Sequence, residues 1–169
     1  MIIGDPYVFG IMFDRIKEWN STKEGNNGFF ALSVYGDMFP NRVNNVVVDT
    51  NLYDVLNSLK NIPVDKEIYF MDKEKALIRL CDLVYPSDYD RDNDYRYELA
   101  PSALTDEGCY VFVLSNKDKI RIIAAELNYD IEESTLIFEG AKIQEVFLDE
   151  TELVKITKEI KIALNEFNN

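Results

Sequence analysis

Histidine is absent from this 169-residue sequence, and its absence removes several kinds of active site. Ser-His-Asp and Cys-His catalysis need an imidazole base, and most catalytic zinc sites use histidine ligands. Glycine is also scarce, since seven glycines are scattered without phosphate-binding or dinucleotide-binding spacing. We therefore expect no catalytic residues of these kinds, no metal and no cofactor, although a hydrolase built from carboxylates alone stays open.

Basic residues are few compared with acidic ones. The chain has 18 Lys and Arg against 31 Asp and Glu, which gives a net charge of −13. A nucleic-acid partner is not expected, because binding to phosphates needs an excess of clustered cations. The acidic balance either keeps the protein soluble or attracts a basic partner.

Long apolar runs are missing as well. No run reaches the roughly 18 residues of a membrane span, and Asp5 and Asp14 interrupt the pattern of a signal peptide. We expect a cytoplasmic protein that does not bind membranes. The two cysteines, Cys81 and Cys109, lack Cys-x-x-Cys spacing and are expected to be buried, reduced thiols.

The apolar residues that are present predict both strands and helices. Phe9, Ile11 and Phe13 alternate as in a strand; a helix also fits this run, but Gly10 disfavours it. Asn27-Gly28 reads as a turn. Other predicted strands are 43–48, 67–71, 109–114, 120–125, 135–138 and 143–148. Predicted helices begin at the caps Thr50, Asp72 and Asp149.

These elements predict an α+β fold. We expect one domain over residues 1–169 with a mostly antiparallel sheet, two central helices and a C-terminal helix packed on one face. The strands 109–114 and 120–125 should form a hairpin, because a polar turn separates them.

One stretch, residues 86–98, lacks a periodic apolar face and is predicted to be an exposed acidic loop. From Asp82 to Glu98 there are six acidic residues against Arg91 and Arg96, with tyrosines interleaved. The stretch is either a solvated loop without a function or a surface that recognises a basic partner. The candidate contact residues are Asp88, Tyr89, Asp90, Asp92, Asp94, Tyr95 and Glu98.

The same loop superficially resembles a calcium-binding loop. Asp88, Asp90 and Asp92 have the spacing of the first ligands of an EF-hand. However, Asn93 replaces the turn glycine and Leu99 replaces the bidentate glutamate. No calcium site is therefore expected.

Several ordered motifs resemble one known family. They are Gly4-Asp5-Pro6-Tyr7, Glu18-Trp19-Asn20, Asn27-Gly28 before Phe29-Phe30-Ala31-Leu32, Gly36-Asp37-Met38-Phe39-Pro40, Ala100–Val113, Lys119–Ile123 and Glu145–Leu148. In order and spacing they resemble the immunity protein 42 family of bacterial polymorphic toxin systems. Residues 85–98 match nothing in that family pattern.

The resemblance implies a function. It implies an immunity protein that binds and neutralises a cognate toxin domain in the cytosol of the producing cell, without catalysis and in a stoichiometric complex. The toxin could be basic, for example a nuclease. The alternative is a small regulatory or ligand-binding α+β domain of unknown ligand, and the oligomeric state stays open.

Overall fold

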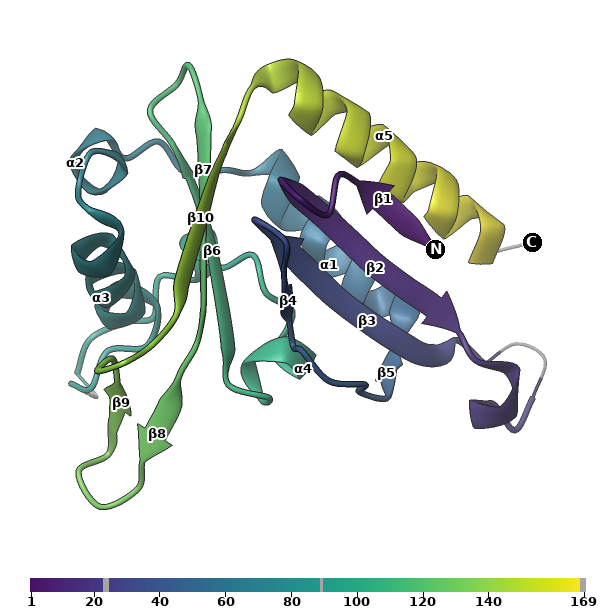
Figure 1. Cartoon of the computed structure of the whole chain (residues 1–169), viewed down its shortest axis with the longest axis horizontal. Coiled ribbons are helices and arrows are strands. Elements are labelled where there is room, and N and C mark those ends of the chain that lie inside the picture. Colours follow the sequence, from purple (N-terminus) through teal and green to yellow (C-terminus); the bar gives the residue numbers. More distant parts are fainter. Residues whose placement is uncertain (23–24, 89, 168–169) are drawn as a thin grey trace.

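Two antiparallel sheets form the body of the protein in the computed structural model, which describes residues 1–22, 25–88 and 90–167 (Figure 1). The first sheet has the order β1-β2-β3-β4, and β5 also pairs with β3. The second has the order β10-β7-β6, and β8 and β9 form a separate hairpin. The first sheet comprises β1 (Ile2–Gly4), β2 (Phe9–Arg15), β3 (Asn27–Val34), β4 (Asp37–Phe39) and β5 (Val46–Val47). The other strands are β6 (Cys109–Ser115), β7 (Ile120–Glu126), β8 (Asn128–Asp130), β9 (Thr135–Ile137) and β10 (Ile143–Leu148).

Helices connect and cover the sheets. They are α1 (Val48–Lys60), α2 (Lys66–Tyr69), α3 (Lys73–Val84), α4 (Ser102–Thr105) and α5 (Glu150–Phe167), with short 3-10 helices at Lys17–Trp19 and Tyr95–Tyr97. In Figure 1, α1 lies behind β2 and β3, α5 runs beside β1, and α3 lies on the far side of the second sheet. The predicted α+β class, with its antiparallel strands and C-terminal helix, is confirmed.

A first hydrophobic core joins the two sheets. The register pairs Phe9 with Val34, Ile11 with Leu32 and Phe13 with Phe30, so alternate residues of β2 and β3 point to one buried face. That face packs on α1, on α5 and on one side of the second sheet. The strand reading of residues 9–15 is therefore correct.

A second core lies on the opposite side of the second sheet. Phe112, Leu114, Ile123 and Ala125 point toward α2 and α3, whose apolar stripe includes Leu77 and Leu80. The second sheet is thus buried on both faces, which explains its unbroken apolar runs. Cys81 and Cys109 are buried free thiols, as predicted.

Local capping chemistry explains two of the helix starts. The Asp72 carboxylate accepts the Lys75 N–H at 3.0 Å, so Asp72 caps α3 as predicted. At α5, the Asp149 N–H donates to the Glu152 carboxylate at 2.8 Å and the Glu152 N–H donates to the Asp149 carboxylate at 2.9 Å, which forms a capping box. Both interactions span three residues and are therefore readable from sequence.

Four local predictions are wrong, and a fifth is right only in part. Residues 66–69 form helix α2 rather than a strand, because Asp65 caps the Ile68 N–H. Helix α1 begins at Val48 without a side-chain cap, so Thr50 is not its cap. Asn27-Gly28 lies inside β3, and residues 135–137 pair with β8 instead of continuing a larger sheet. In addition, only Val46–Val47 of the predicted strand 43–48 is extended and paired.

Among the helices within residues 1–22, 25–88 and 90–167, none combines the length and the apolar character needed to cross a bilayer.

Candidate functional site

The acidic loop, residues 86–98, leaves the C-terminal end of α3 and is tied back to the body. The Asp94 N–H donates to the Leu83 carbonyl at 2.9 Å, and the Asn93 side chain donates to the Val84 carbonyl at 2.8 Å. Tyr97 is buried and its hydroxyl donates to Asp65 at 2.9 Å. The C-terminal half of the loop is therefore packed, unlike the wholly exposed loop expected.

The predicted contact residues occupy different environments. Asp88, Asp90 and Asp92 are exposed, and Tyr95 is 57% exposed. Asp94 is partly buried, and Tyr89 lies outside the described residues. Glu98 is also partly buried and is described separately below. Among the described members of the predicted set, the exposed ones are thus three aspartates and one tyrosine.

Both arginines of the acidic loop are held by carboxylates. Arg91 pairs with Asp82 at 2.9 Å, and its hydrogen bond lowers the pKa of that carboxyl. Arg96 pairs with Asp94 at 2.7 Å and lowers the pKa of Asp94 in the same way. Since these cations are already paired, the exposed aspartates dominate the charge that the loop presents to a partner.

A row of tyrosines runs from the acidic loop onto β6. The rings of Tyr95 and Tyr85 lie 6.3 Å apart and those of Tyr85 and Tyr110 lie 5.4 Å apart, both edge to face. Burial raises the pKa of Tyr110. We call Tyr95, Tyr85 and Tyr110 the tyrosine row. Such side chains give large contact area at low entropic cost.

Glu98 lies beneath the tyrosine row rather than on the surface. The Tyr85 hydroxyl donates to its carboxylate, and the Thr105 hydroxyl donates to it at 3.3 Å. Burial raises the pKa of Glu98 to about 7, the Thr105 hydrogen bond opposes this, and Asp54 adds to it. Glu98, the last residue of the acidic loop, therefore connects Tyr85, which precedes the loop, with Thr105 of α4.

This environment predicts a pH dependence of stability. The pKa of Glu98 is raised from 4.5 to about 7, so the folded state binds the proton more tightly than the unfolded chain. The stabilisation is complete below about pH 4.5 and disappears as the pH rises through 7. Glu98→Gln keeps a hydrogen-bond acceptor but has no carboxyl group to titrate. We therefore expect it to remove this decline in the free energy of unfolding, which is about 1 kcal/mol after solvent screening.

Urea unfolding at pH 5, 6, 7 and 8 measures the effect. The difference in free energy of unfolding between Glu98→Gln and the wild type should grow with pH, since all other groups are common to both. Glu74→Gln, at an exposed position of α3, is the matched control for the loss of one carboxylate and should not show this growth. Parallel curves for Glu98→Gln and the wild type would contradict the assignment.

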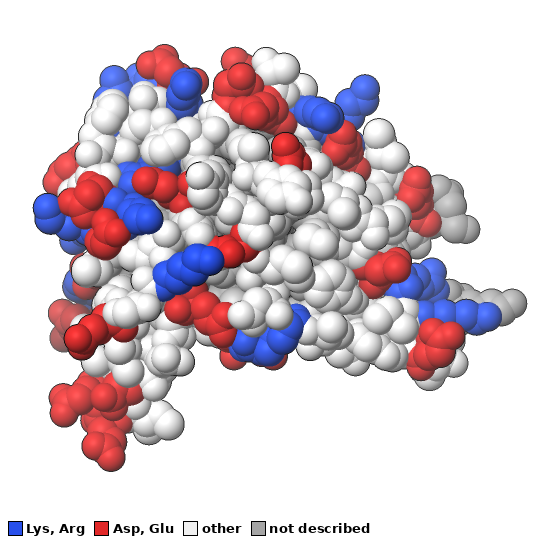
Figure 2. Space-filling view, viewed as in Figure 1, with Lys and Arg blue, Asp and Glu red and all other residues white. Residues whose placement is uncertain are grey.

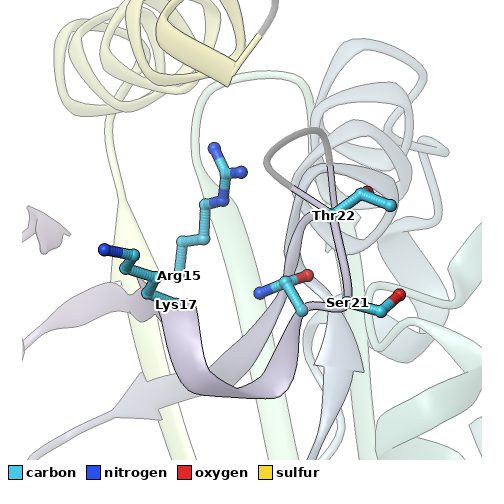
Figure 3. Close-up of a pocket in the computed structure, with 5 residues that line it drawn as sticks. Arg15, Lys17, Ser21 and Thr22 are labelled. Atoms are coloured by element: carbon cyan, nitrogen blue, oxygen red, sulfur yellow. The ribbon is translucent and has the colours of Figure 1, made fainter.

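A separate pocket lies at the far end of β2. Its volume is about 470 Å³, and Arg15, Lys17, Asn20, Ser21 and Thr22 line it. The side-chain amide of Asn20 donates to the carbonyls of Ile16 and Asn27 at 2.7 and 2.9 Å, so it holds the turn. In Figure 3 the Lys17 and Ser21 side chains point away from each other. A ligand site requires polar side chains that point to a common centre, and the lining of this pocket lacks that arrangement.

Within residues 1–22, 25–88 and 90–167, no group of three or more Cys, Asp or Glu side chains could hold a metal ion. The spacing of Asp88, Asp90 and Asp92 thus assembles no such cluster in the described part of the chain.

Comparison with known families decides what kind of protein this is. The family pattern described as immunity protein 42 matches residues 1–163, nearly the whole chain. The chain belongs to the immunity protein 42 family. It is therefore an immunity protein, whose role is to neutralise a cognate toxin.

A solved structure supports the fold of this immunity protein. The crystal structure of CdiI from Burkholderia dolosa AUO158 superposes with a TM-score of 0.75 at 23% sequence identity. The match covers 96% of this chain and 99% of the other. No curated protein gives a significant match.

The contact residues predicted from the sequence of this immunity protein leave out two members of the tyrosine row, Tyr85 and Tyr110. Tyr85 ends α3 just before the acidic loop, and Tyr110 lies on β6. Only the tertiary packing brings the two rings together. The available signal was the tyrosine inside the mostly apolar run Cys109–Ser115.

Proposed function

We propose that this immunity protein acts by stoichiometric, non-catalytic capture of its toxin domain in the cytosol of the producing cell. The observation that carries the proposal is the family match over residues 1–163. The bound protein would cover the toxin's active site or an adjacent exosite. A basic toxin such as a nuclease suits the net charge of −13, because opposite charges accelerate association.

We place one part of the contact surface on the acidic loop and the tyrosine row. The exposed carboxylates of Asp88, Asp90 and Asp92 supply charge, and Tyr95 supplies contact area. Tyr89 belongs to the same proposal by its sequence position, and Asp94 and Glu98 support the loop from inside. Because the rings of the row pack on one another, they lose little freedom on binding.

The decisive experiment is co-expression with the toxin domain encoded beside this gene. Growth rescue together with a co-purified complex of equal stoichiometry supports capture. Rescue at far less than one immunity protein per toxin would instead indicate catalysis. Absence of both rescue and complex would overturn the pairing of this protein with that toxin.

Charge on the acidic loop should control the association rate. Replacing Asp90, Asp92 and Asp94 together by Asn removes three negative charges and should slow association about three- to tenfold at low salt. The salt dependence of the rate should become flatter. Stopped-flow fluorescence between about 20 and 300 mM salt measures both.

A charge-matched control separates local from global charge. Glu67, Glu74 and Glu150 are exposed on α2, α3 and α5, and their joint replacement by Gln removes the same net charge. If both triple variants slow association equally, the acidic loop has no special role.

A further inference from the structure

One apolar face of β7 forms part of the second core. The β8–β9 hairpin continues this face beyond the buried residues. Ile123, Ala125 and Leu127 alternate along one side of β7 and its extension, and all three are buried in the second core. The same alternation reaches Tyr129, which is 57% exposed. The next apolar residue, Ile131, is 84% exposed, more than any other large hydrophobic residue described. Ile131 lies in the turn that follows β8, so this apolar strip continues from Leu127 to the end of the hairpin.

The base of the hairpin is held while its end projects. Leu136, the cross-strand partner of Tyr129, and Phe138 pack against the second core. Beyond them β8 and β9 extend away from the body, as Figure 1 shows at its lower edge. A projecting apolar end with a fixed base is suited to enter a depression on another molecule.

The charge around this end identifies the kind of partner. No Lys or Arg occurs between Arg121 and Lys142. Among the ion pairs of the described residues, none involves Asp130, Glu132, Glu133 or Glu139. Figure 2 shows the hairpin end as a cluster of acidic residues without a basic neighbour. The hairpin thus differs from the acidic loop, whose arginines are paired with carboxylates.

Other occupants fit this end less well. A second copy would bring two identical acidic ends together, and an anionic membrane would repel them. A basic rim around an apolar depression complements both the exposed Ile131 and the unpaired carboxylates.

We propose that the β8–β9 hairpin inserts end first into an apolar depression with a basic rim on the cognate toxin domain. Ile131 and Tyr129 fill the depression, and Glu132 and Glu133 meet the cations of the rim. Asp130 shapes the turn, because its carboxylate accepts the N–H groups of Glu132 and Glu133 at 2.9 and 3.1 Å. This inference rests on the proposed toxin capture and specifies where it occurs.

Binding of the toxin domain encoded beside this gene, measured by biolayer interferometry, tests the apolar part. We expect Ile131→Ala to raise Kd at least about tenfold and the double variant Tyr129→Ala/Ile131→Ala about a hundredfold. The matched control is Ile162→Ala, an isoleucine 51% exposed on α5, which should leave Kd within about twofold. Equal melting temperatures will show that the hairpin variants fold.

The charged part has its own readout. We expect Glu132→Gln/Glu133→Gln to lower the association rate about three- to tenfold at low salt and to change the dissociation rate little. Growth rescue by the same variants, titrated against toxin expression, should follow their Kd.

Four outcomes count against these proposals in different ways. Wild-type Kd for the hairpin variants, with wild-type protein still binding, overturns the hairpin proposal alone. A larger loss for Ile162→Ala places the contact at α5 and also overturns it. A dimer of the isolated protein that Ile131→Ala dissociates assigns the strip to self-association. Wild-type protein that neither binds nor rescues overturns toxin capture itself.

Discussion

Replacing Arg121 by Met should lower the free energy of unfolding by about 3–5 kcal/mol. The guanidinium is only 2% exposed and donates from Nη1 to the carbonyls of Ile68, Tyr69 and Met71 at 3.1, 2.9 and 2.8 Å. It also pairs with Glu145 at 2.7 Å. Methionine has a similar length but no donor, so three carbonyls at the end of α2 and one carboxylate lose their partner.

Urea unfolding followed by circular dichroism measures this loss. Arg79→Met is the control, because Arg79 is 52% exposed and pairs with Asp82 at 3.3 Å, and it should cost less than about 1 kcal/mol. Glu145→Gln should fall between the two, since its side chain is 29% exposed. A cost below about 1 kcal/mol for Arg121→Met would show that water replaces the guanidinium.

Replacing Gly28 by Ala should cost about 3 kcal/mol or more. Gly28 lies in β3 between Arg15 of β2 and Val46 of β5. A Cβ atom there would lie 1.9 Å from the carbonyl oxygen of Asp14 and 3.0 Å from the Cα atom of Arg15. Both are backbone atoms, so β2 and β3 must move apart to make room.

Thermal and urea unfolding of a second glycine variant separates this clash from backbone strain. Gly140 has φ of +74° but nothing within 4 Å of the added atom. Gly140→Ala should therefore cost only the left-handed strain, about 1–2 kcal/mol. Equal losses for the two variants would mean that β2 and β3 separate easily at Gly28.

Local signals made much of the fold predictable. The caps at Asp72 and Asp149 act over three residues, and the alternation in β2 shows directly in the order of side chains. The hairpin of β6 and β7 follows from two apolar runs separated by a polar turn. Each of these signals acts within a few residues, so a sequence contains it.

The errors arose where a distant segment decides the conformation. Asn27-Gly28 has the composition of a turn, but pairing with β2 and β5 on either side holds it in a strand. Residues 66–69 are too short for a clear period, and the Arg121 guanidinium caps the carbonyls at their helical end. Arg121 lies in an aliphatic run, and nothing in the sequence predicted that it would cap α2.

The sequence by itself determined the acidic charge, the absence of histidine chemistry, the α+β class and the family resemblance that the comparison confirmed. These properties depend on composition, on short-range periodicity and on motif order. Tertiary structure alone decided which charged and aromatic groups reach the surface together. Glu98 turns inward, the arginines of the acidic loop pair with carboxylates, and Tyr110 packs against Tyr85. Such proximities depend on sheet pairing between distant segments, which sequence order does not contain.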